Sequence, residues 1–517
     1  MLNSVIRYLE NTTLRFPSKT AIIDKDKALT FSELRNRALL VGAEIIKHGN
    51  PIKKPIFVYL PKGCDIICAF MGVLYSGNFY TPTDVRFPFE KVKGILDALN
   101  PELIISDEDH SPFLIEHGVS KNLILTIESC SSHSDAISSV SLLNEDIKDS
   151  LKASLDKTID TDIAYILFTS GSMGVPKGVA ITHGSIIDYI DWAKECFKIT
   201  EQNIIANQAP FYFDNSTLDI YLMLSTGSTL HIIPEQYYSF PAKLMSYVAE
   251  NKINTVFWVP SVLINVANAD ILSAIDTSCL QKILFAGEVM PNKHLNYWRR
   301  HLPNALYANL YGPTEITVDC TYYIVDREFK DDEPLPIGSP CPNTEVLLLD
   351  EQKQLITEHN KIGELCVRGR SLAVGYWKNP DKTQEAFIQN PLNDNYSERI
   401  YCTGDLAHYN ELGEIMYDGR KDFQIKHMGY RIELGEIETA AVSIEAVKEV
   451  CCLYDLKEKR IVLFYVGDVV DKELRSELAR KIPKYMIPTV YHQLNNFPYN
   501  DNGKIDRKKL QGTYLGI

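Results

Sequence analysis

The sequence lacks an excess of positive charge, an even and paired set of cysteines, and any hydrophobic run long enough to cross a membrane. Lys and Arg number 53 against 67 Asp and Glu, and the net charge of −14 disfavours nucleic acid and anionic membranes as partners. The 11 cysteines are scattered, and the adjacent pair Cys451 and Cys452 suits neither a routine disulfide nor a spaced zinc site. The most apolar stretch, residues 66–75, has about ten residues, whereas a membrane helix needs roughly 20. These absences favour a protein of the reducing cytoplasm.

The chain is long enough to form more than one domain. With 517 residues, it is longer than the chains that usually fold around a single hydrophobic core. Short apolar runs rich in β-branched and aromatic residues alternate with helix-like segments, which predicts α/β layers with largely parallel strands. Strands are expected at residues 55–60, 103–105, 123–127, 164–168, 229–233 and 282–286. Residues 131–154, rich in Ser and Asp, are expected to form a surface excursion.

The pattern changes near residue 418 and predicts two domains. Residues 1–418 are expected to form a large α/β body of layered subdomains, and residues 419–517 a small, mobile α+β domain. In the small domain, helices are expected from Glu436 and Asp471, and strands near 447–454 and 460–465.

A loop at residues 167–179, Leu-Phe-Thr-Ser-Gly-Ser-Met-Gly-Val-Pro-Lys-Gly-Val, follows one of these predicted strands. Its glycines would let backbone N–H groups approach phosphate oxygens, its hydroxyls would donate hydrogen bonds, and Lys177 would add positive charge. It differs from a Walker loop, because Pro176 precedes the lysine and Gly178 follows it. A flexible surface turn is the alternative for glycine and serine alone, but the full pattern favours phosphate binding.

This loop and a series of other motifs resemble the adenylate-forming superfamily. That superfamily includes the amino-acid adenylation domains of nonribosomal peptide synthetases, the D-alanine:carrier-protein ligases and the acyl-CoA ligases. The further motifs are Leu-Thr-Phe-Ser-Glu-Leu at 29–34, Phe-Asp-Asn-Ser at 213–216, Tyr-Gly-Pro-Thr-Glu at 311–315, Gly-Glu-Leu at 363–365, Gly-Tyr at 375–376, Tyr-Cys-Thr-Gly-Asp at 401–405, Gly-Arg-Lys-Asp at 419–422, Gly-Tyr-Arg-Ile-Glu-Leu-Gly-Glu-Ile-Glu at 429–438 and Asn-Gly-Lys-Ile-Asp at 502–506. They stand in the family's order and cover nearly the whole chain.

The resemblance implies ATP and Mg²⁺ as cofactors. Tyr311 would stack on adenine, Asn309 would bond its amino group, and Asp405 would accept the ribose hydroxyls. Thr314 would contact the α-phosphate, and Glu315 would hold Mg²⁺, which prefers hard oxygen ligands. The implied nucleotide-binding set is Thr169, Ser170, Gly171, Ser172, Gly174, Gly287, Glu288, Asn309, Tyr311, Asp405 and Arg420, and the implied catalytic set is Lys504, Thr314, Glu315 and Lys177.

Three further positions carry expectations of their own. Lys504 follows a tight-turn signal and, by the resemblance, would reach the active site during adenylation, although a lysine near a C-terminus is usually a solvated charge. Asp422 would be the hinge of the small domain, with a plain loop carboxylate as its alternative. Met173 stands where many relatives have threonine, and it cannot donate a hydrogen bond to phosphate.

The substrate class is predicted from Asp214. A carboxylate in an apolar setting needs a partner, and an α-ammonium group would supply one, which favours an amino acid. The alternative is that Asp214 caps a helix beginning near Asn215. The family's pocket positions fall on Asp214, Asn215, Leu218, Trp258, Leu284, Ala286, Leu310, Val318 and Asp319.

This mostly apolar lining resembles that of free-standing proline-activating ligases that load carrier proteins. L-Proline is therefore the first expectation. D-Alanine is the runner-up, because residues 285–291 and 422–426 also resemble the D-alanine ligases, although those usually have a cysteine where Ala286 stands.

The expected acceptor is the phosphopantetheine thiol of a separate carrier protein. Only 13 residues follow Lys504, too few for a carrier domain, and no attachment site is recognisable elsewhere. CoA is the less favoured acceptor. A catalytically inactive nucleotide-binding regulator is the alternative from another class, and the presence of Lys504 and Glu315 argues against it.

Overall fold

The computed structural model describes residues 2–25, 27–130, 140–141, 143–169, 176–422, 424–499 and 505–515. The chain divides into two compact units. The first comprises Met1–Val85, Leu99–Leu167 and Gly178–Lys421, and the second comprises Arg86–Ala98, Phe168–Lys177 and Asp422–Ile517. The domain boundary expected at 418/419 stays a prediction. It lies close to the change of unit after Lys421.

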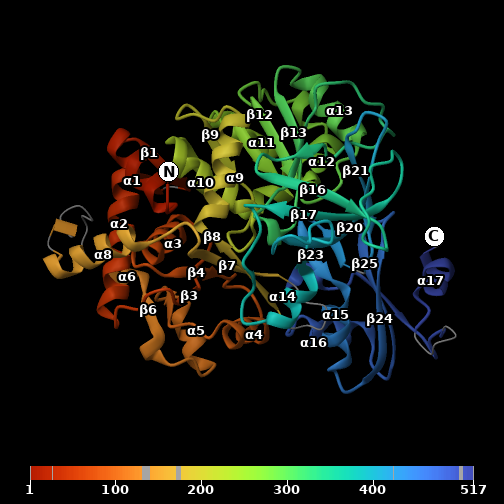
Figure 1. The fold of residues 1–517 in the computed structure, drawn as a ribbon. Helices are drawn as coiled ribbons and strands as arrows, with labels where there is room; N and C mark the ends of the chain where they lie inside the picture. The colour runs from red at the N-terminus through yellow and green to blue at the C-terminus, as the bar shows by residue number, and fades with distance from the viewer. Residues whose placement is uncertain are drawn as a thin grey trace. The chain divides into compact units, whose positions relative to one another are not determined.

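The first unit contains a sheet that, over the described residues, has nine strands in the order β15-β14-β13-β12-β11-β9-β10-β1-β2 (Figure 1). They are β1 (Thr20–Asp24), β2 (Lys27–Thr30), β9 (Ile204–Asn207), β10 (Thr229–Ile232), β11 (Thr255–Trp258), β12 (Lys282–Ala286), β13 (Leu306–Tyr311), β14 (Thr321–Ile324) and β15 (Ser339–Pro340). The inner strands from β1 to β13 pair in parallel, and antiparallel pairs lie at the two edges. The carboxyl ends of β9, β11, β12 and β13 therefore meet at one edge.

Over the described residues, two other sheets lie mainly in this unit, with the end of β7 and the first residue of β8 belonging to the second unit. One has the order β18-β8-β7-β4-β3-β5-β6, and the other has β16-β17-β20-β19 with β21 paired to β20. Their strands are β3 (Pro55–Val58), β4 (Phe79–Pro82), β5 (Leu103–Ser106), β6 (Ile124–Thr126), β7 (Ile163–Thr169), β8 (Lys177–Thr182), β16 (Thr344–Leu349), β17 (Gly363–Gly369), β18 (Gly375–Tyr376), β19 (Phe387–Gln389), β20 (Arg399–Tyr409) and β21 (Ile415–Arg420). All six strands expected from the sequence are confirmed within a few residues.

The α-helices of this unit over the described residues are α1 (Ile6–Arg15), α2 (Phe31–Lys47), α3 (Cys64–Tyr75), α5 (Ser111–Glu116), α6 (Ile127–Cys130), α8 (Glu145–Lys157), α9 (His183–Cys196), α10 (Asn215–Thr226), α11 (Pro241–Glu250), α12 (Pro260–Asn268), α13 (Asn292–His301) and α14 (Pro380–Ala386). Local signals explain their limits. Thr30 and Glu33 form a capping box at the start of α2, and α10 ends at Gly227, whose φ of 81° suits glycine. The apolar stretch 66–75 lies in α3, which is buried on nearly every side.

The helix α8 corrects the expectation of a surface excursion at residues 131–154. Residues Glu145–Lys157 are helical, and Leu151 and Leu155 are buried at a spacing of one helical turn. Residues 131–139 and 142 lie outside the described residues.

The second unit holds β22 (Gln424–His427), β23 (Tyr430–Glu433), β24 (Val447–Asp455), β25 (Arg460–Gly467), β26 (Val490–Gln493), α15 (Leu434–Val442), α16 (Asp471–Leu478) and α17 (Arg507–Leu510), together with most of α4 (Phe89–Leu99). The helices and strands expected after residue 418 are confirmed. Arg507 binds both carboxylate oxygens of Glu438, at 2.6 and 2.9 Å, which ties α17 to α15.

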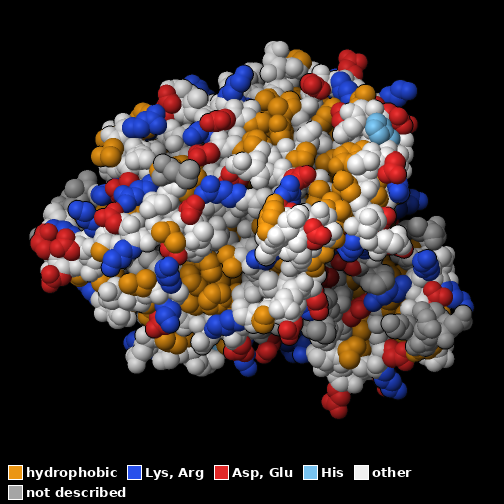
Figure 2. All heavy atoms as spheres, viewed as in Figure 1, with side chains coloured by type: hydrophobic (Ala, Val, Ile, Leu, Met, Phe, Trp, Pro, Cys, Tyr) orange, Lys and Arg blue, Asp and Glu red, His pale blue; other side chains and the backbone are white. Residues whose placement is uncertain are grey.

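The surface carries charges of both signs. On the face drawn in Figure 2, Lys and Arg side chains are interspersed with Asp and Glu. Among the helices of the described residues, none combines the length and the apolar character needed to cross a bilayer.

Candidate active site

An apolar group of predicted pocket residues lies at the carboxyl edge of the nine-stranded sheet. Ala286 on β12 is directly opposite Leu310 on β13, so these side chains share one face of the sheet, and Leu284 shares it two residues earlier. Leu218 of α10 and Val318 are buried in the same hydrophobic cluster. The strand register therefore brings three of the predicted pocket residues together, and Leu218 and Val318 belong to the same hydrophobic core.

Trp258 is placed differently. It is opposite Phe285 in the β11–β12 pairing, so it lies on the other face of the sheet from Leu284 and Ala286. Its side chain is fully buried in a second hydrophobic cluster, and its indole N–H donates to the Ala206 carbonyl at 3.1 Å. Trp258 acts in this structure as a core residue behind the group.

The turn after β13 presents the next predicted residues. Gly312 is required there, because a Cβ at this position would lie 2.4 Å from the Val318 carbonyl oxygen. Thr317 and Val318 both have positive φ, 60° and 74°, which is unusual for β-branched residues and is a mark of backbone strain. Asp319 follows, and its buried carboxylate accepts a 2.6 Å hydrogen bond from the Tyr189 hydroxyl of α9.

Asp214 stands at the start of α10. One carboxylate oxygen accepts the Asn215 N–H at 2.9 Å, and the other accepts the Thr314 hydroxyl at 2.6 Å. The helix-capping alternative thus describes one of its contacts. The second contact links Asp214 to the Thr-Glu motif that follows β13, so the predicted substrate and phosphate positions adjoin.

Glu315 lies in the short 3₁₀ turn η4 (Thr314–Ile316) and is completely buried. Its Oε1 accepts a 2.9 Å hydrogen bond from the Tyr376 hydroxyl of β18. A buried carboxylate with hydroxyl groups nearby offers the hard oxygen atoms that Mg²⁺ prefers.

A polar group connects three strands near the end of β13. The Tyr311 hydroxyl donates to the Asp405 carboxylate of β20, and the Arg420 guanidinium of β21 binds the other Asp405 oxygen at 2.8 Å. Burial, followed by the Asp405 charge, raises the pKa of Tyr311 well above its usual value. Thr403 accepts the Asp405 N–H at 3.0 Å. Asn309, also buried, donates through Nδ2 to the Pro336 carbonyl at 2.8 Å.

Gly287 and Glu288 follow β12. Gly287 has φ of 94°, which favours glycine. The Glu288 carboxylate accepts the Ser261 N–H at 2.9 Å and also the Ser261 hydroxyl, at the start of α12. Glu288 thus stabilises the N-terminus of α12, a contact that the motif did not predict.

The remaining predicted residues belong to the second unit or lie outside the described residues. Thr169 ends β7 and Lys177 begins β8, so they flank the predicted phosphate loop. Asp422 is the first residue of the C-terminal segment of the second unit and accepts the Gln424 N–H at 3.2 Å. Ser170, Gly171, Ser172, Met173, Gly174 and Lys504 lie outside the described residues.

Two family models match this chain. The model described as "AMP-binding enzyme" matches residues 9–377, and the model described as "AMP-binding enzyme C-terminal domain" matches residues 436–504. The chain belongs to the AMP-binding enzyme family. It is an adenylation enzyme of the adenylate-forming superfamily, as the motifs predicted.

Curated relatives of this AMP-binding enzyme include single-domain and multidomain proteins. It is 31% identical to an L-proline--[L-prolyl-carrier protein] ligase of Streptomyces coelicolor, over 98% of this chain and 96% of the ligase. It is 29% identical to tyrocidine synthase 2 of Brevibacillus parabrevis, over 98% of this chain but only 14% of the synthase. The crystal structure of IdnL1 has a TM-score of 0.80 at 24% identity, over 96% of this chain and 99% of that one, which confirms the fold.

Two tyrosines of the AMP-binding enzyme were not predicted as site residues. Tyr376 stands in the recognised Gly-Tyr motif, which gave it no role, yet it binds Glu315. Tyr189 binds Asp319 from a position 130 residues earlier in the chain. The motif was a usable signal for Tyr376, whereas the contact of Tyr189 depends on how α9 packs.

Proposed function

We propose that this enzyme uses ATP and Mg²⁺ to activate L-proline as prolyl-AMP, and transfers the prolyl group to the phosphopantetheine thiol of a separate carrier protein. The observation that carries the proposal is the direct link between Asp214 and Thr314. It joins a carboxylate suited to an ammonium group with a hydroxyl of the adenylation motif.

The nucleotide end rests on the polar group of Tyr311, Asp405 and Arg420. Arg420 pairs with the Asp405 carboxylate and orients it, and a carboxylate would accept ribose hydroxyls through its paired oxygens. Asn309 donates through its nitrogen to Pro336, which leaves its carbonyl oxygen to accept the adenine amino group. Tyr311 supplies the ring against which adenine stacks.

The amino-acid end rests on Asp214. Its oxygens accept hydrogen bonds from the Asn215 N–H and the Thr314 hydroxyl, which orient the carboxylate. A carboxylate oriented in this way would attract the ammonium group of an amino acid, and proline would offer it two N–H donors. An amino acid is therefore favoured over a simple carboxylic acid, which has no cation for Asp214.

The side-chain end favours a small apolar ring. Leu218, Leu284, Leu310 and Val318 are each at most 2% exposed, so a substrate side chain placed among them would meet apolar surface. Asp319 already accepts the Tyr189 hydroxyl, which makes it a poor sole partner for a long cationic side chain. The likeness to a prolyl-carrier ligase over nearly its whole length supports the same choice.

In the adenylation step, a carboxylate oxygen of the amino acid attacks the α-phosphorus of ATP and the bond to pyrophosphate breaks. Glu315 would hold Mg²⁺, which supplies positive charge to the phosphate oxygens, and its buried carboxylate suits that ion. Thr314 would donate to the α-phosphate, and Lys504 would bridge the two reacting groups. In the second step, the carrier thiol displaces AMP from the carbonyl carbon.

The change of unit immediately before Asp422 supports the proposed hinge, because a turn at this point would move residues 422–517 together. A substitution of Asp422 by proline fixes φ and should impair the transfer step more than adenylation.

The first test is ATP–pyrophosphate exchange with Mg²⁺ and a panel of the 20 amino acids plus D-alanine, followed by mass spectrometry of a holo carrier protein incubated with enzyme, ATP and the best amino acid. Exchange and a prolyl-loaded carrier are expected. Exchange led by D-alanine would favour a D-alanine:carrier-protein ligase, and no exchange by the folded protein would favour a nucleotide-binding regulator.

Lys504→Ala should suppress exchange by several orders of magnitude while prolyl transfer from supplied prolyl-AMP persists.

A further inference from the structure

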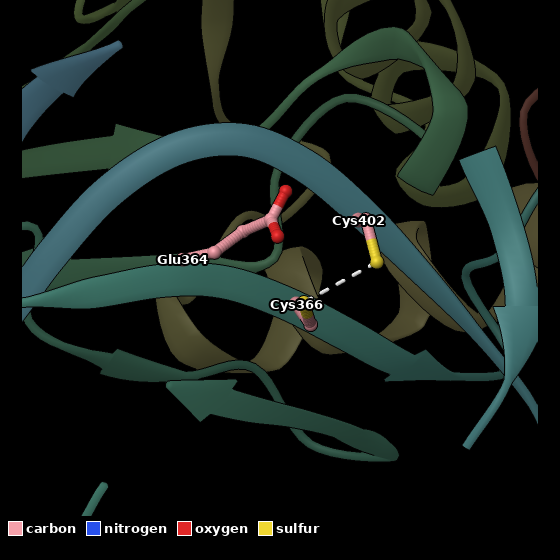
Figure 3. A group of neighbouring side chains, drawn as sticks. All are labelled: Glu364, Cys366 and Cys402. Atoms are coloured by element: carbon pink, nitrogen blue, oxygen red, sulfur yellow. Dashed lines mark hydrogen bonds between the residues drawn. The ribbon is translucent and has the colours of Figure 1, made fainter. Parts of the chain in front are cut away.

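Two cysteines face each other across β17 and β20. Cys366 and Cys402 are direct partners in the antiparallel register, and directly opposite residues have Cα atoms roughly 4.5–5.5 Å apart, within the range that a disulfide spans. Their sulfur atoms are 3.5 Å apart, and the Cys366 thiol donates to the Cys402 sulfur (Figure 3). A disulfide between them therefore needs only a small movement of two side chains.

The charges around this pair distinguish a metal site from a thiol site. Glu364, Cys366 and Cys402 offer ligand atoms within 4.8 Å of one another, as a metal would need. However, the ammonium groups of Lys353 and Lys421 bind the same Glu364 oxygen, at 2.9 and 3.1 Å. A metal cation would have to displace or face two positive charges. The same charges stabilise a thiolate, so they favour thiol chemistry.

The two sulfurs are not equivalent. Cys402 is partly exposed, and the hydrogen bond from Cys366, followed by the charges of Lys353 and Lys421, lowers its pKa against the opposing effects of burial and of the Glu364 carboxylate. Cys366 is fully buried, and its interaction with Cys402 together with burial raises its pKa far above the usual range. This asymmetry suits an accessible attacking thiolate beside a resolving thiol.

We propose that Cys366 and Cys402 form a reversible regulatory disulfide whose oxidant is a small-molecule disulfide of the glutathione type. The Cys402 thiolate attacks one sulfur of the oxidant, breaks its S–S bond and releases one thiolate, which takes a proton from water. Cys366 then loses its proton to solvent and attacks the Cys402 sulfur, the S–S bond between Cys402 and the small molecule breaks, and the second small thiolate leaves and takes a proton from water. Two protein thiols are oxidised, and one small disulfide is reduced to two thiols.

The pair adjoins the polar group at the nucleotide end. Thr403 follows Cys402, donates to the Leu365 carbonyl next to Cys366 at 2.7 Å, and accepts the Asp405 N–H. A cross-link between residues 366 and 402 would shift Thr403 and, through its hydrogen bond with the Asp405 N–H, the Asp405 carboxylate. An increase in the KM for ATP on oxidation is therefore expected. This consequence rests on the proposed function, whereas the disulfide itself does not.

The experiment titrates the full-length protein with glutathione disulfide and reads the intact mass and a non-reducing peptide map. A species lighter by two hydrogens is expected, with peptides 366 and 402 linked, and dithiothreitol should reverse it. Cys366→Ser should stop at a mixed disulfide on Cys402, and Cys402→Ser should form neither product. Cys279→Ser, which removes another partly exposed cysteine, should behave as wild type. Failure of the wild-type protein to form this disulfide, or its formation with other cysteines instead, would overturn the proposal.

Two further readouts keep the outcomes distinct. Incubation with Zn²⁺ alone should leave no stoichiometric metal after desalting, and retained zinc that is lost in Glu364→Gln would show a metal site in place of the thiol pair. Exchange kinetics of the reduced protein test the proposed function independently. If reduced protein is active and the disulfide forms without any change in the KM for ATP, the regulatory role is wrong.

Discussion

The nucleotide end and the amino-acid end of the candidate site are built differently. The nucleotide end joins Tyr311, Asp405 and Arg420 across three strands by hydrogen bonds to a buried charge. The amino-acid end combines one polar anchor, Asp214, which accepts the Thr314 hydroxyl, with predicted pocket residues that are buried and apolar, such as Leu284 and Leu310. Loss of one partner at the nucleotide end leaves a charge unpaired, whereas an apolar exchange at the other end changes only shape. Substitutions at the nucleotide end should therefore abolish activity. Apolar substitutions at the amino-acid end should instead change which amino acid is preferred.

The largest effect is expected for Asp405→Asn. The variant lacks the charge that pairs with Arg420 and that would accept two ribose hydroxyls, so kcat/KM for ATP should fall about a thousandfold, or on the order of 4 kcal/mol. Pyrophosphate exchange at varied ATP measures it. Asp418→Asn, which removes the partner of His408 on the same pair of strands, is the matched control and should leave the KM for ATP unchanged. Equal effects of both substitutions would contradict the role of Asp405.

A smaller, general effect is expected for Asp214→Ala. Loss of the charged partner of the ammonium should lower kcat/KM about a hundredfold for every amino acid alike, because each has the same ammonium group. Asp214→Asn retains a carbonyl oxygen to cap α10 but has no charge, so it separates the two roles. Exchange by Asp214→Asn at the wild-type rate would mean that Asp214 serves only the helix.

At the amino-acid end, Leu310→Ala should change the preference among amino acids. Proline should lose about tenfold in kcat/KM, and larger apolar amino acids should gain by a similar factor. The substitution should also cost about 2–5 kcal/mol of unfolding free energy. Leu222→Ala removes a comparably buried leucine of α10 that is not a predicted pocket residue, so it should destabilise without changing preference. An unchanged amino-acid ranking in Leu310→Ala would place Leu310 outside the pocket.

The smallest effect on activity is expected at Asp219, buried in α10 behind the amino-acid end. Burial raises its pKa from 3.8 to about 8, so the folded protein keeps a proton that the unfolded chain releases. Stability should therefore fall as the pH rises from about 4 to about 8, then level off.

Asp219→Asn keeps the acceptor for the Asn207 amide and lacks this titration. It should be more stable than wild type at pH 8, and the difference should shrink toward pH 4. Urea unfolding at the two pH values measures it, and an unchanged pH dependence in the variant would contradict a protonated Asp219.

Much of the fold follows from local sequence. Runs such as 282–286 became buried parallel strands because β-branched and aromatic residues there are apolar on both faces. The motifs around Tyr311 and Asp405 named side chains that do meet. In contrast, α8 was missed because its Ser and Asp content masked the spacing of Leu151 and Leu155.

Other contacts depend on information that no local segment holds. The sequence grouped Trp258 with Leu284, but strand register places them on opposite faces of the sheet. The contact between Tyr189 and Asp319 needs the packing of a distant helix. The meeting of Cys366 and Cys402 needs the pairing of β17 with β20, which the scattered cysteines did not indicate.

The most direct test of L-proline as the substrate is the ratio of kcat/KM for L-proline to that for L-alanine, D-alanine, L-leucine and L-phenylalanine in ATP–pyrophosphate exchange. Proline has two more carbons than alanine to bury among the leucines, which is worth on the order of 1.5 kcal/mol, or about tenfold. L-Proline is expected to lead by at least this factor, with the larger residues excluded by shape. A panel led by D-alanine or L-leucine would contradict the proline assignment.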